Sequence, residues 1–250
     1  MSSAQAEFDA LARSLGAIGD PAIRVAYVRH ALRNCPPERA ADLFTVAMAS
    51  AEGRRSAHVE LLQALSLAFA DDACDGVREA VRAVLEARQQ LSLARALTRV
   101  VLMEDAETQR IPDFGMGRTV SLGERKSLAR SHDRELIARC LRDPHPHVVR
   151  ILLGNPIVTE TDVVRMCARR PASTEVLREV FRSPRWIVRY PVKVALALNP
   201  YTPVDVGLQL APLLQAQDLR RLSVANDVSE ELREACHRIA TGSTDSTVLH

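Results

Sequence analysis

A short corner pattern recurs five times between Ala129 and Leu232 of this 250-residue chain. Each copy has a small or apolar residue, a polar break that often ends in Pro, a Ser, Thr or Asp, and then a new apolar run. The copies are Ala129-Arg-Ser-His-Asp133-Arg-Glu-Leu136, Leu153-Gly-Asn-Pro-Ile-Val-Thr159, Ala168-Arg-Arg-Pro-Ala-Ser173, Leu198-Asn-Pro-Tyr-Thr202 and Ala225-Asn-Asp-Val-Ser229. The pattern is typical of a connection between two helices. Its repetition predicts an all-α chain built as an α-solenoid, in which each unit buries its apolar face against its neighbours.

Helices are also predicted for the first half of the chain, where the corner pattern is missing. Only 4% of the residues are aromatic and there are 10 Gly, while Ala, Leu, Val and Arg abound, a composition that favours helices. Apolar residues at helical spacing predict six helices, over about residues 8–15, 21–32, 37–47, 61–69, 77–85 and 93–101. Asp20-Pro21 and Asp71-Asp72 are predicted to open two of them as caps.

The chain is therefore expected to have four sections. Residues 1–104 form an N-terminal helical section, 105–120 a loop or linker that contains Gly and Pro, 121–240 the helical repeats, and 241–250 a flexible tail. Ile111, Phe114 and Met116 are large apolar residues within the otherwise polar linker. Such residues either fold back onto a helix or contact a binding partner, and the sequence leaves both readings open.

Two segments of the repeat section resemble a known family. Leu141-Arg-Asp143-Pro-His-Pro-His-Val148-Val149-Arg150 resembles the HEAT-repeat signature, and Ser183-Pro-Arg-Trp-Ile-Val188-Arg189 repeats it. The Asn-Pro corners are also similar to the leucine-rich repeat variant, another all-helical repeat. The resemblance covers mainly residues 120–240, and it implies that the Asp caps a helix, the Val packs between repeats and the Arg joins a ladder of polar contacts. It implies a scaffold and no particular activity.

Net charge argues against some classes of partner. The chain has 33 Lys and Arg against 31 Asp and Glu, a formal net charge of +2. A nearly balanced charge gives no strong global field, so nucleic acid is not expected as a partner, and neither is a membrane. The excess is concentrated in residues 121–250, which carry 19 basic and 15 acidic side chains.

Cysteine usage and the first residues predict a cytoplasmic location. The five cysteines are scattered without a CxxC pair, which fits buried thiols in a reducing compartment. The first residues have neither a cationic nor an apolar signal region, and no run of 18 apolar residues occurs.

No cofactor, metal or catalytic site is expected from the motifs. His145-Pro-His147 with Cys140 and Cys167 lacks the ligand spacing of a zinc site. The segment from Gly115 to Ser127 superficially suggests a phosphate loop, but it lacks Gly before Lys-Ser and a preceding buried strand. No nucleophile elbow or carboxylate pair stands out, so an enzyme is not expected.

The densest candidate binding signal is an Arg-rich segment with aromatic residues. It comprises Arg169, Arg170, Arg178, Arg182, Arg185, Trp186, Arg189, Tyr190 and Lys193. Arg, Trp and Tyr dominate binding hot spots. Because residues 178, 182, 185 and 189 recur at steps of three and four, we expect one exposed basic surface. The competing reading is a set of solvated arginines around a Trp that packs between repeats.

These features together favour a non-catalytic adaptor or regulatory subunit in a cytoplasmic signalling or assembly complex of bacterial type. The expected partner is another protein with an acidic surface, and Ile111, Phe114 and Met116 are further candidate contacts. The alternative is nucleic-acid binding on an Arg-rich face, as in the HEAT-like alkylpurine DNA glycosylases, whose catalytic carboxylate and aromatics find no match in this chain. A third alternative is an enzyme whose site is not visible in the sequence.

Overall fold

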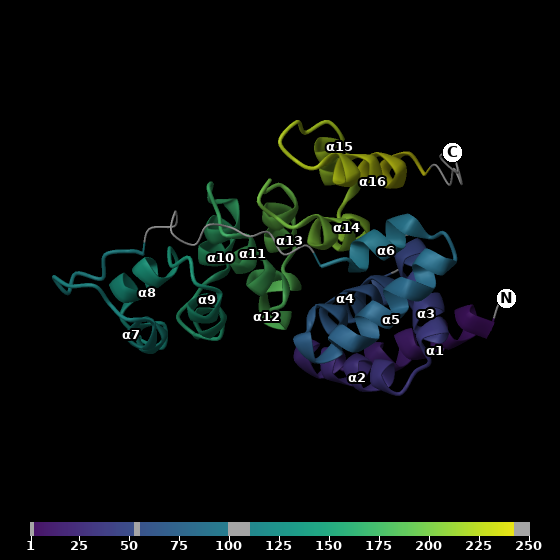
Figure 1. Cartoon of the computed structure of the whole chain (residues 1–250), viewed down its shortest axis with the longest axis horizontal. Helices are drawn as coiled ribbons and strands as arrows, with labels where there is room; N and C mark the ends of the chain where they lie inside the picture. The colour runs from purple at the N-terminus through teal and green to yellow at the C-terminus, as the bar shows by residue number, and fades with distance from the viewer. Residues whose placement is uncertain (1–2, 53–55, 100–110, 243–250) are drawn as a thin grey trace. The chain divides into compact units, whose positions relative to one another are not determined.

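The computed structural model describes residues 3–52, 56–99 and 111–242, and in these ranges all regular secondary structure is helical (Figure 1). The predicted all-α fold class is confirmed. Backbone contacts divide the chain into two compact units. Unit 1 comprises residues 1–99 and 204–250, and unit 2 comprises residues 100–203.

Unit 1 begins with six helices, of which the fourth lies at the centre. They are α1 (Ser3–Gly16), α2 (Pro21–Arg33), α3 (Pro37–Glu52), α4 (Ser56–Ala70), α5 (Asp75–Ala87) and α6 (Leu91–Leu97). Helix α4 contacts α1, α2, α3 and α5. It buries Leu61, Leu65 and Phe69, and the ring of Phe69 meets that of Phe44 edge to face at 5.6 Å. A helix that is apolar on most of its faces is expected at the centre of such a bundle.

Caps set two of these helix starts, one of them differently from the sequence prediction. The Asp20 carboxylate accepts hydrogen bonds from the backbone N–H groups of Ala22 and Ile23, as expected for a cap before Pro21. Asp71, in contrast, caps the 3-10 turn η1 (Asp72–Cys74) and not α5 itself. The Asp71 carboxylate accepts a hydrogen bond from the N–H of Ala73. This bond stabilises the 3-10 turn, which lies between Asp71 and the start of α5 at Asp75.

The last helices belong to unit 1, whereas the sequence pattern groups them with the predicted repeats of 121–240. They are α14 (Val204–Leu210), η3 (Ala211–Leu213), α15 (Ala216–Ser223) and α16 (Glu230–Thr241). Gln209 donates a buried 2.7 Å hydrogen bond to the Ala96 carbonyl at the end of α6. Gly207 lets α16 approach α14 closely, because a Cβ there would lie 3.0 Å from Leu232 Cδ2. The predicted tail beyond Gly242 and linker residues 105–110 lie outside the described residues.

The described part of unit 2, residues 111–203, contains seven short helices. They are α7 (Leu122–Leu128), α8 (Arg134–Cys140), α9 (Pro146–Leu153), α10 (Glu160–Ala168), α11 (Thr174–Phe181), α12 (Pro184–Ile187) and α13 (Tyr190–Ala197). Helix α9 contacts α7 and α11, while α10 contacts α13. Helices α7, α9 and α11 therefore lie side by side as alternate helices, and Val149, Leu152 and Leu177 are completely buried.

Reciprocal capping boxes open two helices of unit 2. Ser121 and Glu124 open α7, and Thr159 and Asp162 open α10, each pair with reciprocal side-chain to backbone hydrogen bonds. The reciprocal bonds satisfy amides that have no partner within the helix. The Thr159 cap starts α10 at the end of the second copy of the corner pattern, where the pattern predicts a new helix.

Asn155 links the corner after α9 to the corner between α7 and α8 through hydrogen bonds of its side chain. The Asn155 side-chain amide donates to the carbonyls of Ala129 and Ser131, at 2.9 and 2.8 Å. Its Oδ1 accepts from the N–H of Ile157 at 2.9 Å. One side chain therefore satisfies three backbone groups where the chain turns between helices.

The HEAT-like signature has a local geometry other than the resemblance implies. His145, not Asp143, caps α9, through Nδ1 and the N–H of His147. The Asp143 side chain is fully buried and accepts two hydrogen bonds from Arg125 of α7, at 2.7 and 2.8 Å. Burial of the Asp143 carboxylate costs desolvation free energy, and the pairing with Arg125 offsets this cost. The exposed start of α9 is capped by His145 instead.

Candidate functional site

A groove of about 510 Å³ lies between α8 and α10 in unit 2. Its apolar lining, called the apolar base below, includes Ala138, Leu141 and the buried Met166, and most of the other lining residues are charged. The charged residues are four arginines and one aspartate, namely Arg134, Arg142, Arg165, Arg169 and Asp162. The groove therefore has an excess of positive charge.

The helical spacing explains why these side chains share a groove. Asp162, Arg165, Met166 and Arg169 follow one another at steps of three, one and three residues along α10 and its end. Residues spaced in this way lie on one face of a helix. Arg134 and Ala138 are four residues apart on α8 and supply the facing wall by the same rule.

Arg134 and Asp162 form a bidentate charge pair in the groove. Arg134 donates from both terminal nitrogens to the two carboxylate oxygens, at 2.8 and 2.6 Å. The hydrogen bond from Arg134, against the opposing effect of burial, lowers the pKa of Asp162 to about 2. Thr159 donates from its N–H and its hydroxyl to the same carboxylate. Asp162 is thus ionised and fully engaged, and it neutralises one of the four arginines.

Arg142 and Arg165 are the arginines of the groove that remain available. Both side chains are exposed, and neither makes a hydrogen bond or ion pair with another described residue. Arg169 donates to the Arg142 carbonyl at 3.2 Å and stays exposed. A guanidinium that is exposed beside an apolar base can form paired hydrogen bonds with a carboxylate or a phosphate.

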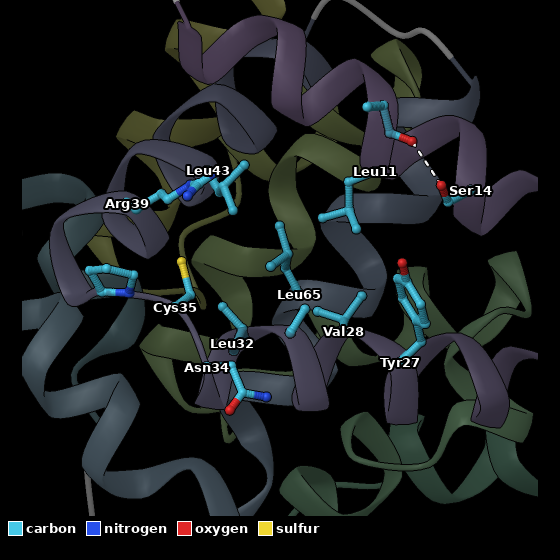
Figure 2. A pocket seen from close by; sticks show the side chains of 13 residues that line it. Leu11, Ser14, Tyr27, Val28, Leu32, Asn34, Cys35, Arg39, Leu43 and Leu65 are labelled. Atoms are coloured by element: carbon cyan, nitrogen blue, oxygen red, sulfur yellow. Dashed lines mark hydrogen bonds between the residues drawn. The ribbon is translucent and has the colours of Figure 1, made fainter.

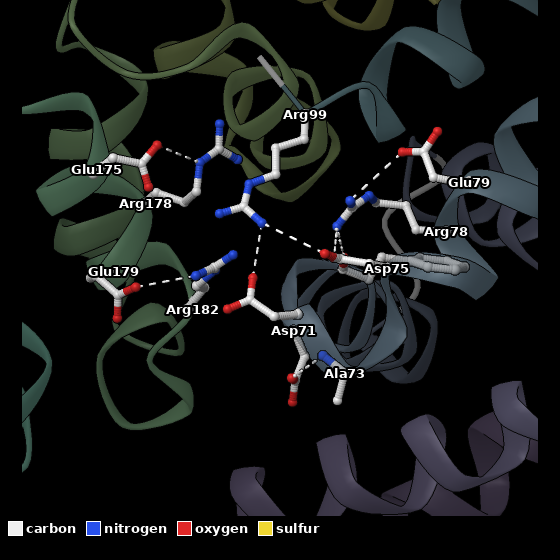
Figure 3. Close-up of polar contacts among 12 residues, drawn as sticks. Asp71, Ala73, Asp75, Arg78, Glu79, Arg99, Glu175, Arg178, Glu179 and Arg182 are labelled. Carbon is white, nitrogen blue, oxygen red and sulfur yellow. Dashed lines mark hydrogen bonds and ion pairs between the residues drawn. The ribbon is translucent and has the colours of Figure 1, made fainter. Parts of the chain in front are cut away.

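The Arg-rich segment from Arg169 to Lys193 does not form the single exposed basic surface expected from its spacing. Arg178, Trp186 and Lys193 are buried. Arg178 pairs with Glu175 at 3.6 Å, and Arg182 with Glu179 at 3.2 Å (Figure 3). The expectation fails because Arg178 lies on α11 and Arg185 on α12, so no single helix continues the spacing of three and four residues through this segment.

The buried side chain of Trp186 is held by contacts within unit 2. Its indole N–H donates to the Leu153 carbonyl at 2.7 Å, and the guanidinium of Arg185 lies 4.5 Å from its ring centre. Arg185 also donates to the Asn155 carbonyl at 3.1 Å. These contacts lie between α12 and the corner after α9. Of the two readings of this segment, the burial of Trp186 supports the one in which its side chain packs inside the protein.

The remaining members of the segment are dispersed. Arg170 donates to the Leu198 carbonyl at 2.7 Å, and the exposed Arg189 lies 3.8 Å from Glu160. Tyr190 is half-buried at the start of α13. Burial lowers the pKa of Lys193 to about 8. Of the predicted residues, only Arg169 lines the α8–α10 groove.

The described part of the predicted linker folds back at one of its three apolar residues. Phe114 is buried, with 4% of its surface exposed, whereas Ile111 and Met116 are exposed. Arg139 of α8 donates to the Asp113 carbonyl at 3.0 Å, which ties the loop to unit 2. Gly115 is required beside this contact, because its φ is +74° and a Cβ would lie 2.7 Å from Arg139.

The His145 and His147 rings lie 5.2 Å apart at the start of α9. Cys140 and Cys167 are both buried, and burial raises the pKa of the Cys140 thiol to about 11. No group of three or more His, Cys, Asp or Glu side chains is close enough to hold a metal ion among the residues that the structure describes.

Comparison of the chain with protein-family models, curated proteins and solved structures finds no match. In the described ranges, no helix has the length and apolar character needed to cross a membrane. The function of the chain has to be argued from the groove itself.

Proposed function

We propose that the chain is a non-catalytic adaptor or regulatory subunit that binds an acidic segment of another protein in the groove between α8 and α10. We also propose that unit 2 is a short HEAT-like solenoid that presents this groove. The single observation that carries the proposal is the pair of exposed arginines, Arg142 and Arg165, beside an apolar base.

The chemistry of the lining supports an acidic peptide. Two arginines without a partner among the described residues supply planar donors for carboxylates, and Leu141 and Met166 supply apolar area next to them. Complementary charge steers association and sets specificity, while the apolar base adds affinity. The volume of about 510 Å³ accommodates several side chains of a partner.

The helix arrangement supports the solenoid. Helices α7, α9 and α11 lie side by side, and the Asn155 and Asn199 corners bond in the same way to the preceding corner of the pattern. In a solenoid, helices of one layer line an extended surface that other proteins can occupy. The α8–α10 groove lies between two successive helices of one such layer.

A binding assay tests the proposal. Fluorescence anisotropy should show saturable binding of a labelled hexaglutamate peptide to the full chain, weakening as salt is added because exposed charges are screened. The double variant Arg142→Glu/Arg165→Glu should lower the affinity about tenfold or more, since two attractive pairs become repulsive.

The matched control changes the net charge equally at another place. Arg220→Glu/Arg221→Glu reverses two exposed arginines on α15 of unit 1 and should leave the affinity within about twofold. Equal losses in both double variants would mean that the peptide responds only to net charge. Tighter binding of a single-stranded oligonucleotide than of the peptide would favour the nucleic-acid alternative.

A further inference from the structure

The α8–α10 groove holds three arginines that have no acidic partner within its described lining. They are Arg142, Arg165 and Arg169, and all three are exposed. Asp162, the one acidic residue of this lining, is already bonded to Arg134 through both carboxylate oxygens. The groove therefore presents three guanidiniums that an anion from outside the chain can neutralise.

Sequence spacing and one hydrogen bond bring these three charges close together. Arg165 and Arg169 are four residues apart at the end of α10, so their side chains lie on one face. The Arg169 guanidinium donates to the Arg142 carbonyl at 3.2 Å, which brings the end of α10 to the chain just after α8. Like charges four residues apart on a helix repel each other. An anion that binds between them removes this repulsion, and an anion with two charges removes more of it.

A phosphate monoester matches this set of donors better than a carboxylate does. Near neutral pH a phosphorylated side chain carries a charge of about −1.5 to −2 and has three strong acceptor oxygens, whereas a carboxylate carries a single charge on two oxygens. Arginine binds phosphate through paired hydrogen bonds, and arginine clusters commonly recognise phosphorylated side chains. A phosphate can offer one oxygen to each of three guanidiniums, and a carboxylate cannot.

The apolar base of the groove favours a peptide as the carrier of the phosphate. Ala138, Leu141 and Met166 supply aliphatic surface beside the arginines. Such a surface suits an aliphatic side chain next to a phosphorylated Ser or Thr, because its burial removes apolar area from water. Single-stranded nucleic acid is commonly held by aromatic side chains that stack on its bases, and none of the described lining residues is aromatic.

The cavity of unit 1 has a different chemistry. It measures about 350 Å³, and its lining is largely aliphatic, with Leu11, Leu32 and Leu65 among its residues (Figure 2). Arg39, the one charged residue of this lining, already interacts with another group. The described lining of this cavity therefore offers an anion no free charge, in contrast to the α8–α10 groove.

We propose that the α8–α10 groove recognises a phosphorylated Ser or Thr beside an aliphatic residue, with the phosphate held by Arg142, Arg165 and Arg169. The inference rests on the proposed function, because it uses the same groove and the same class of partner. It adds that phosphorylation of the partner strengthens binding, and it assigns Arg169 to the phosphate.

Three peptides with the same label test the proposal on the full chain by fluorescence anisotropy. They share the sequence Gly-Ala-Leu-Xaa-Leu-Ala-Gly and carry phosphoserine, Glu or Ser at Xaa. We expect the phosphoserine peptide to bind about tenfold more tightly than the Glu peptide, and the Ser peptide to bind most weakly. Equal affinity for the phosphoserine and Glu peptides would overturn the proposal. If hexaglutamate still binds through Arg142 and Arg165 in that case, the proposed function stands, whereas a chain that binds neither hexaglutamate nor the phosphoserine peptide would overturn both.

One variant locates the phosphate. Arg169→Gln should reduce the preference for phosphoserine over Glu from about tenfold to about twofold, because the phosphate loses one of its three charged donors. Arg130→Gln is the matched control, since Arg130 is an exposed arginine of unit 2 that lies outside the lining and also donates to a backbone carbonyl, that of Lys126. This control should keep the tenfold preference. An unchanged preference in Arg169→Gln would overturn the assignment, and tighter binding of a single-stranded oligonucleotide than of the phosphoserine peptide would overturn the peptide as the occupant.

Discussion

Asn155 and Asn199 make the same three hydrogen bonds at two corners of unit 2. Asn199 donates from its side-chain amide to the carbonyls of Cys167 and Arg169, at 2.6 and 2.9 Å, and accepts from the N–H of Tyr201 at 3.0 Å. Asn155 does the same with Ala129, Ser131 and Ile157. Both are followed by Pro, and the two are 44 residues apart. The recurring corner pattern thus corresponds to a recurring hydrogen-bond arrangement.

Replacing either asparagine should therefore destabilise the chain. Asn155→Ala and Asn199→Ala each leave two carbonyls and one N–H without their partner, and we expect each to lower the free energy of unfolding by about 2–4 kcal/mol. Asn226→Ala is the control, because Asn226 lies at a similar corner but is exposed and makes no side-chain hydrogen bond with a described residue. Urea denaturation measures all three. A loss below about 0.5 kcal/mol at residues 155 and 199 would contradict this account of the corners.

Phe114 should stabilise the isolated chain. Because its ring is buried, Phe114→Ala removes a large apolar side chain and should cost about 3–5 kcal/mol of unfolding free energy. Met116→Ala, in the same loop but exposed, should cost less than about 1 kcal/mol. Thermal melting of the two variants measures the difference. Unchanged melting temperature for Phe114→Ala, with lost affinity for the hexaglutamate probe, would instead assign the loop to partner binding.

The Arg134–Asp162 pair should make the free energy of unfolding depend on pH in the acidic range. The hydrogen bond from Arg134 lowers the folded-state pKa of Asp162 from 3.8 to about 2. A depressed pKa contributes stability that is present above pH 4 and is lost as the pH falls toward 2. The difference in unfolding free energy between the native chain and Arg134→Gln should therefore be constant near neutrality and shrink between pH 4 and pH 2. A difference that is independent of pH over this range would contradict the pairing.

Cys35 should react before the other thiols. It is half-buried, whereas Cys74, Cys140, Cys167 and Cys236 are buried. Burial raises the pKa of the Cys236 thiol to about 12, which removes the reactive thiolate at neutral pH. Titration with a disulfide reagent should label one thiol rapidly in the folded chain, and Cys35→Ser should remove that phase. Rapid labelling of Cys35→Ser would show that another cysteine is accessible.

Helical periodicity and capping residues predicted where helices form, but they did not predict which helices pack together in each unit. The Ser121–Glu124 and Thr159–Asp162 boxes follow from residues three positions apart, so the sequence displays them directly. The bond from Gln209 to the Ala96 carbonyl, which joins the last helices to unit 1, spans 113 positions. No periodicity within a single helix carries such information.

The candidate site was missed for the same reason. Spacing placed Arg178, Arg182, Arg185 and Arg189 on one surface, but a helix end at Phe181 separates them. The groove joins Arg142, just after α8, to Arg165 on α10, across a complete intervening helix. The signal available in the sequence was the spacing of Asp162, Arg165 and Arg169, which marks one polar face on α10.

The most direct measurement of peptide binding is an NMR titration that follows the Nε–Hε signals of the arginines in the full chain. Arg→Lys variants assign the signals. The account predicts that hexaglutamate shifts the signals of Arg142 and Arg165 along one saturable curve, while those of Arg220 and Arg221 on α15 stay in place. Shifts confined to Arg185 and Arg189, with Arg142 and Arg165 unchanged, would contradict the α8–α10 groove as the binding site.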